Sequence, residues 1–397
     1  MALVQKYRMS VNEVFVLKGI AILLIILHNF SHRLPGTVQE NQHFFLAERF
    51  DQMVSVLTNG GPNLLINLLS HYGHYGVAIF VFLCGYGLAI KYTRETTDIS
   101  FAAFSLKHAK KLWLLMLPLL LPHFLFMCIK KASYFSDHIG DLLMMTTFTS
   151  GFNPDPYVFH GPWWFFSLIF QLYIVYYLSV YGRSLKPVIA ISIASIILQA
   201  AIMSLGTMDG IAYLSRTFVG YMLPFTVGIV FAQKSTYPSY GLALAMLVLF
   251  FVCGSNKYLW PFTFTLLPIA LMPLERLARR LGKVYSFILF IGANSAYIFI
   301  IHPIVRSSTL DLSETSVLLA YVVYLTASIA AAYYYKRLLF WAKQKITQAL
   351  AEKKSTEKVT LPQNAVKINN RLLRHLLTRI REMGKRTASE SVFVCTF

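Results

Sequence analysis

The residues best suited to chemistry stand at the two ends of the first apolar segment. Lys18 opens this segment, His28 follows ten residues later, and His32 lies about one helical turn beyond His28. A titratable group is costly inside a bilayer, so its presence there indicates a functional role. An imidazole can take a proton from a hydroxyl, or return one, near neutral pH. We therefore predict acid–base catalysis at His28, with His32 as the competing candidate.

The composition indicates an integral membrane protein. Of the 397 residues, 56% are hydrophobic and 13% are charged, whereas a soluble domain of this length needs more polar surface. Cysteine and histidine spacing shows no zinc-binding pattern, so we expect no metal site and no permanently bound cofactor. The formal net charge is +19, and the basic residues lie beside and between the apolar segments. The sequence contains no nucleic-acid-binding motif. A nucleic-acid partner is therefore not expected.

Ten apolar segments approach the roughly 20 residues that a helix needs to cross a bilayer. The expected fold class is all-α, a polytopic bundle of about ten transmembrane helices. The expected spans are residues 14–30, 74–91, 112–129, 162–181, 187–205, 213–232, 240–254, 258–273, 285–304 and 316–335. Prolines interrupt the eighth of these segments, which is also short.

Basic residues predict the orientation of the bundle. They are concentrated before the first span and after the second, fourth, sixth and eighth spans. The positive-inside bias then predicts a multi-pass protein of the inner (cytoplasmic) membrane with both termini in the cytoplasm. His28 and His302 accordingly fall in the outer halves of the first and ninth spans. We expect His302 to line the same outer cavity as His28, with simple packing beside Pro303 as the alternative.

Other polar and aromatic residues gather near the outer ends of the spans. We expect His43, His71 and His138 to be solvated, as histidines in loops commonly are. Trp163 is expected in the interfacial aromatic belt. The side chains expected to contact substrate are Trp164, Gln171, Tyr173 and Arg216, although Arg216 could simply snorkel to the interface.

Four stretches resemble the acyltransferase 3 family of membrane enzymes, and they occur in the family's order. Residues 17–28, 75–86, 163–173 and 296–303 are similar to its first-span, second-span, tryptophan-led and late tyrosine–histidine signatures. The family usually separates the first-span basic residue from the histidine by eleven positions, whereas Lys18 and His28 are ten apart. Ten positions rotate a helix by roughly 280°, so these two side chains need not face the same way. The glutamate pair common in the family's tryptophan-led span is replaced by Ile169 and Phe170.

The resemblance implies an enzyme that O-acylates envelope or exported carbohydrates. Its expected partners are acetyl-CoA as acyl donor, a carbohydrate or glycolipid as acceptor, and the membrane lipids. Lys18 would meet the donor phosphates as a point charge, or would serve only as a topological anchor. His28 would deprotonate the acceptor, or would carry the acyl group as a transient acyl-imidazole.

A proton-coupled transporter or flippase for a glycan or small molecule is the alternative function. In that case His28 and His302 would form a proton path through the membrane. Internal symmetry and paired discontinuous helices would favour this alternative.

The chain is expected to divide into two parts. Residues 1–340 would form the transmembrane acyltransferase domain, and residues 341–397 a basic cytoplasmic tail. Within the tail, the polar residues 343–361 are expected to form a flexible linker. Leucines alternate with arginines over residues 371–386, a pattern typical of an amphipathic helix on an anionic membrane surface, with a disordered tail as the alternative.

Overall fold

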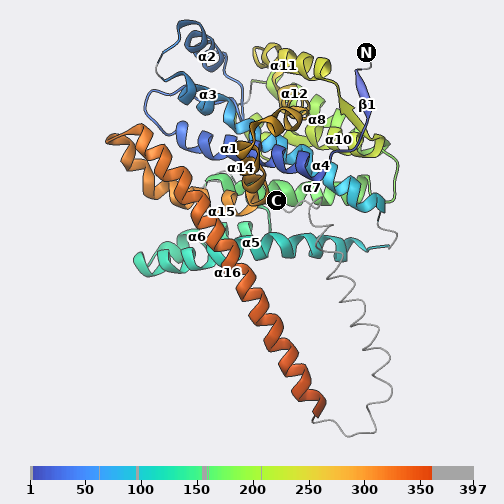
Figure 1. Cartoon of the computed structure of the whole chain (residues 1–397), viewed down its shortest axis with the longest axis vertical. Helices are drawn as coiled ribbons and strands as arrows, with labels where there is room; N and C mark the ends of the chain where they lie inside the picture. The colour runs from blue at the N-terminus through green and yellow to red at the C-terminus, as the bar shows by residue number, and fades with distance from the viewer. Residues whose placement is uncertain are drawn as a thin grey trace.

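The computed structural model of the chain describes residues 3–61, 63–94, 98–153, 159, 161–206 and 208–359 (Figure 1). Helices dominate it, as the all-α class predicts. The α-helices are α1 (Val11–Ser31), α2 (Ala47–Asn59), α3 (Leu64–Tyr72), α4 (Gly76–Arg94), α5 (Phe101–Lys130), α6 (Tyr134–Thr146), α7 (Trp164–Ser179), α8 (Lys186–Ser204), α9 (Met208–Ser215), α10 (Phe218–Lys234), α11 (Tyr240–Gly254), α12 (Trp260–Leu271), α13 (Leu274–Ala278), α14 (Lys283–Ala293), α15 (Ser295–Thr309) and α16 (Val317–Val359). Strands β1 (Val4–Lys6) and β2 (Thr236–Pro238) pair antiparallel and tie the start of the chain to the end of α10.

The start of α1 is fixed by a capping box. The hydroxyl of Ser10 accepts a hydrogen bond from the backbone N–H of Glu13 at 3.2 Å, and Glu13 Oε2 accepts one from the backbone N–H of Ser10 at 2.6 Å. Two N–H groups at the helix start thereby gain acceptors. The hydroxyl of Tyr7 donates to the same carboxylate oxygen at 2.9 Å. The box sets the first residue of α1 and hence the direction in which its later side chains point.

Six helical segments are long and apolar enough to cross a membrane, which supports a multi-pass protein. They are Val11–Ser31, Leu64–Tyr92, Phe101–Lys130, Lys186–Ser204, Asp209–Lys234 and Val317–Ala351. Helices α11 and α12, at two further expected spans, have only 15 and 12 residues. Helix length and composition therefore do not confirm the expected ten spans.

The expected ninth span is not one straight helix. Helices α14 and α15 are apolar enough to cross together, but they are bent by 82° relative to one another. The break lies at Asn294, whose side-chain amide donates to the carbonyl oxygen of Phe290 at 2.7 Å. Lys336 Nζ, on α16, donates to Asn294 Oδ1 at 2.8 Å, so α16 is hydrogen-bonded to the residue at the bend. An asparagine side chain that bonds nearby backbone competes with the regular helical pattern, which accounts for the break.

Residues 343–359, expected to belong to a flexible linker, are helical. Helix α16 continues without interruption to Val359, across the expected boundary between residues 340 and 341. Figure 1 shows the second half of α16 extending away from the other helices. The amphipathic pattern over residues 371–386 lies outside the described residues.

Glycines allow a close contact between α4 and α10 in the core. A Cβ added at Gly228 would collide with the carbonyl oxygen of Phe82, and one added at Gly85 would collide with that of Phe225. Small residues let membrane helices approach until their backbones touch. This contact fixes α4 beside α10 and thereby holds the segment immediately before α4, which faces His28.

Candidate functional site

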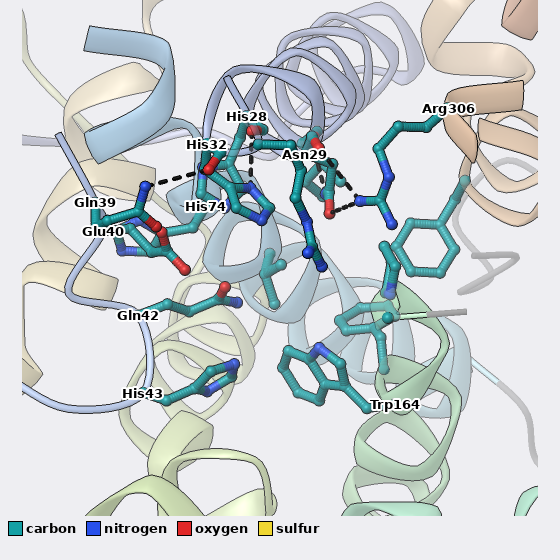
Figure 2. Close-up of a pocket in the computed structure, with 17 residues that line it drawn as sticks. His28, Asn29, His32, Gln39, Glu40, Gln42, His43, His74, Trp164 and Arg306 are labelled. Atoms are coloured by element: carbon teal, nitrogen blue, oxygen red, sulfur yellow. Dashed lines mark hydrogen bonds between the residues drawn. The ribbon is translucent and has the colours of Figure 1, made fainter. Parts of the chain in front are cut away.

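A cavity of about 350 Å³ lies at the end of α1 where His28 and His32 are found (Figure 2). Its walls come from α1, the segment after it, the 3₁₀ turn Gly73–Tyr75, the start of α4, the 3₁₀ turn Gly161–Trp163, the start of α7, and α15. The lining residues are Ile25, His28, Asn29, His32, Arg33, Gln39, Glu40, Gln42, His43, His74, Val77, Gly161, Pro162, Trp164, Phe165, Phe299 and Arg306. Four histidines, one carboxylate and two arginines thus share one small space.

His28 is held in one orientation by a backbone carbonyl. Its Nδ1 lies 2.8 Å from the carbonyl oxygen of Ser70, so the neutral ring donates from Nδ1 and keeps a lone pair on Nε2. The side chain is 3% exposed. A buried imidazole with a fixed tautomer and an available Nε2 has the arrangement that a general base requires.

The carbonyl of Ser70 is itself positioned by the segment that follows α1. The hydroxyl of Ser70 donates to the carbonyl oxygen of Val38 at 2.6 Å, and the N–H of Val38 donates to Asn67 Oδ1 at 2.9 Å. Gly73 lies directly against α1, and a Cβ there would stand 2.5 Å from the Cβ of His28. The glycine therefore permits the close approach that places the turn and the Ser70 carbonyl beside His28.

His32 lies beside His28 in the same cavity. The two ring centroids are 4.8 Å apart, and His32 Nδ1 lies 3.1 Å from the carbonyl oxygen of His28. Burial, reinforced by the neighbouring His28 and Arg33, lowers the pKa of His32 to about 2. His32 is therefore neutral at physiological pH, and its Nε2 also carries a lone pair.

The structure adds to the site several residues that sequence reasoning did not place there, Arg306 among them. Glu40, His43 and His74 all line the cavity. Glu40 Oε2 is buried and meets no hydrogen-bond partner among the described residues, and the same is true of both ring nitrogens of His74. The His74 ring lies 5.7 Å from that of His28. The one available signal was that Glu40 is the first carboxylate after His32 in the chain.

Of the three histidines expected at the solvated surface, His71 is buried and His43 is half-buried. His43 packs edge-on against Trp164 with ring centroids 5.3 Å apart, and burial, with Arg216 and His28 nearby, lowers the pKa of His43 to about 3. His71 is 4% exposed and its Nδ1 lies 2.9 Å from the carbonyl oxygen of Gln39. The segment between α1 and α2 folds back over α3, which removes the His71 ring from solvent and leaves His43 half-buried. The third, His138, is part-buried and pairs with Asp141 at 3.0 Å.

Trp164 and Arg306 complete the cavity on its other sides. Figure 2 shows Trp164 and His43 across the cavity from His28. Arg306 Nη1 donates to the backbone oxygen of Asn29 at 3.2 Å and to its side-chain oxygen at 3.1 Å. The cavity thus holds a fixed positive charge close to the end of α1.

Five further residues expected in the site do not line the cavity. Lys18 lies about 15 Å from His28 along α1, as ten residues of helix rise require. His302 is fully buried with Nδ1 3.3 Å from the carbonyl oxygen of Ile298, and α15 presents other side chains to the cavity. Tyr173 packs at a tilt against His108, with ring centroids 4.2 Å apart. Arg216 is buried next to Ser215, whose hydroxyl donates to the carbonyl oxygen of His43.

Gln171, the fifth, joins two helices. Its Oε1 accepts from the N–H of Phe218 at 3.0 Å, at the start of α10, and its Nε2 donates to the hydroxyl of Ser167 at 3.0 Å. Nearby Trp163 is also structural, because it is 0% exposed and its indole N–H donates to the carbonyl oxygen of Ile300. It therefore does not stand in an interfacial belt.

Replacing Gln171 with alanine should weaken the fold more than the chemistry. The N–H of Phe218 and the hydroxyl of Ser167 would each lose a partner, at a cost of about 1–3 kcal/mol in the free energy of unfolding. We expect a lower melting temperature in detergent and unchanged turnover per folded molecule. Gln348→Ala, on the exposed part of α16, is the matched control. Lost turnover at unchanged stability would instead support the substrate contact expected from the sequence.

The cavity can support proton transfer and can hold charged groups. His28 and His32 present lone pairs, and Arg306 presents a cation. The donor atoms of His28, His32 and Glu40 lie within 4.8 Å of one another, so these three residues could also hold a metal ion.

Comparisons with known proteins agree with the signatures in the sequence. The model of the acyltransferase 3 family, described as an acyltransferase domain, matches residues 11–337. Comparison with curated proteins and with solved structures gave no match. The family match begins at the first residue of α1, includes every residue that lines the cavity, and extends into α16. Since it covers most of the chain, this protein belongs to the acyltransferase 3 family of membrane acyltransferases.

Proposed function

We propose that this protein transfers an acetyl group from cytoplasmic acetyl-CoA to a hydroxyl of an envelope or exported carbohydrate, with His28 as the general base. The observation that carries the proposal is the fixed tautomer of His28. Ser70 holds Nδ1, so Nε2 remains to take a proton at the wall of a cavity that can admit a sugar hydroxyl.

The proposed reaction includes two proton transfers, and His28 takes part in both. Nε2 of His28 removes the proton of the acceptor hydroxyl while its oxygen attacks the thioester carbonyl. The new C–O bond forms, the C–S bond breaks, and the thiolate of coenzyme A leaves. The imidazolium of His28 then returns its proton to that thiolate. The ring therefore ends the cycle neutral, as it began.

Arg306 is suited to stabilise the charge that develops in this reaction. The thioester carbonyl oxygen becomes negative as the acceptor oxygen attacks, and a cation fixed beforehand stabilises such charge efficiently. Two oxygens of Asn29 hold Arg306 Nη1 at 3.1–3.2 Å. The guanidinium is thus positioned before substrate binds.

The donor would approach from the opposite end of α1. Lys18 lies about 15 Å from His28 along the helix, towards the side that the basic connections place in the cytoplasm. Helix α13 packs against α1 at this end, and Arg276, Arg280 and Lys283 lie in or after it. These cations and Lys18 would attract the phosphates of the donor, while the acetyl group reaches the cavity.

Membrane vesicles of known sidedness test this proposal. Acetyl-CoA does not cross membranes, so labelled acetyl-CoA added outside should acetylate a glycan enclosed in inside-out vesicles and should not acetylate the same glycan supplied outside sealed right-side-out ones. Labelling from the opposite face would overturn the orientation. Proton-coupled uptake of the glycan without acetylation would overturn the function in favour of a transporter. Among the described residues one broken helix pair is found, α14 with α15, whereas paired discontinuous helices would favour transport.

A further inference from the structure

We propose that the cavity contains a binding site for one divalent transition-metal ion of the Zn²⁺ class, formed by His28, His32 and Glu40. The site goes beyond acyl transfer, because metal binding can be measured whether or not the protein transfers acetyl groups. The donor atoms of the three residues lie within 4.8 Å of one another (Figure 2).

Both histidines are prepared as metal ligands. Nδ1 of each ring faces a backbone carbonyl, that of Ser70 for His28 and that of His28 for His32. A metal-ligating histidine commonly donates its other N–H to a carbonyl, which fixes the ring and its tautomer. Nε2 is then the nitrogen that each ring presents to an ion.

Glu40 supplies an anionic ligand from a different segment of the chain. Its Oε2 is buried and meets no hydrogen-bond partner in the described part of the chain. Its backbone carbonyl accepts a hydrogen bond from Arg49 Nη1, which fixes the main chain that carries this carboxylate. A buried carboxylate oxygen without a partner is costly, and a bound cation would remove that cost.

The geometry fits a site with an open position. Two nitrogens and one carboxylate oxygen form a ligand set known from catalytic zinc sites, which leave the fourth position to water or substrate. In a tetrahedral zinc site, metal–ligand distances of about 2.0–2.1 Å place the ligand atoms about 3.4 Å apart. The three side chains must therefore close inwards when an ion binds. His74, whose two nitrogens meet no hydrogen-bond partner among the described residues, stands next to the site.

Metal binding and base catalysis at His28 exclude one another. An ion on Nε2 uses the lone pair that would otherwise accept the proton of the acceptor. Zn²⁺ should therefore inhibit acetyl transfer reversibly, and a chelator should restore it. Inhibition depends on the proposed function, whereas binding does not.

Calorimetric titration of the full-length protein in detergent with ZnCl₂ tests the site directly. We expect the wild type to bind one equivalent of Zn²⁺. The variants His32→Ala and Glu40→Gln should bind Zn²⁺ at least about tenfold more weakly, because even the loss of a group that hydrogen-bonds a metal ligand costs about that much affinity. His138→Ala is the control, because it removes a histidine that also has a carboxylate neighbour but lies outside the cavity. Melting temperatures measured without metal identify any variant that fails to fold.

Co²⁺ provides a second readout that does not require activity. Tetrahedral Co²⁺ absorbs strongly in the visible range, and this absorption should appear with the wild type and His138→Ala and be lost with His32→Ala. The site is overturned if no equivalent of either ion binds, or if folded His32→Ala and Glu40→Gln bind as tightly as the wild type. Metal binding without acetyl transfer would contradict the proposed function and leave the metal site standing.

Discussion

Replacing His28 with alanine is expected to reduce acetyl transfer by about 10²–10⁴-fold, the contribution usual for a positioned general base. The ring is buried, its Nδ1 is engaged by Ser70, and its Nε2 is the nitrogen left for the acceptor. The loss should fall on kcat, because proton removal takes place in the transition state and not in substrate binding. Initial rates with labelled acetyl-CoA, normalised to folded protein, measure the effect.

His123→Ala is the matched control for this variant, because it removes a histidine from another candidate span, α5, that does not line the cavity. It should retain wild-type turnover. His32→Ala distinguishes the two neighbouring rings, since a loss as large as that of His28→Ala would be unexpected if His28 is the base. Full loss in His32→Ala together with wild-type turnover in His28→Ala would move the catalytic role to His32.

Replacing Gly73 with alanine is expected to damage both the fold and the site. The new Cβ would stand 2.5 Å from the Cβ of His28 and 2.7 Å from the carbonyl oxygen of Leu24, so the 3₁₀ turn must move away from α1. Overpacking of this kind typically costs about 1–3 kcal/mol in the free energy of unfolding. A displacement of about 1 Å at a catalytic group can cost about 10²-fold in rate. We therefore expect a lower melting temperature and strongly reduced turnover.

Gly140→Ala is the corresponding control on α6. A Cβ at Gly140 would meet nothing within 4 Å, so alanine should leave turnover unchanged and stabilise the helix by up to about 1 kcal/mol. Thermal unfolding and transfer assays on both variants make the comparison. Wild-type behaviour of Gly73→Ala would show that the contact between the turn and α1 does not position His28.

Local sequence predicted the helices well and their shapes less well. The expected spans coincide with helical segments, because apolar segments form helices in a membrane, but residues 213–232 and 285–304 are each divided between two helices. The bend at Asn294 was not predicted, since an asparagine inside an apolar segment does not by itself indicate a break, and Lys336, which also bonds Asn294, lies 42 residues away in sequence. The continuation of α16 to Val359 was also missed, because polar composition alone does not distinguish a linker from an exposed helix.

The sequence alone determined that this is a helical membrane protein with acyltransferase 3 signatures, and that His28 and His32 are its leading catalytic candidates. Those conclusions depend on composition and on residues close together in one segment, which local physics specifies. Only the tertiary structure brought Glu40, His43 and His74 to His28, because the segment after α1 folds back through hydrogen bonds to α3. It also kept His302 out of the cavity, because the direction of a side chain depends on how whole helices pack, and no local pattern encodes that packing.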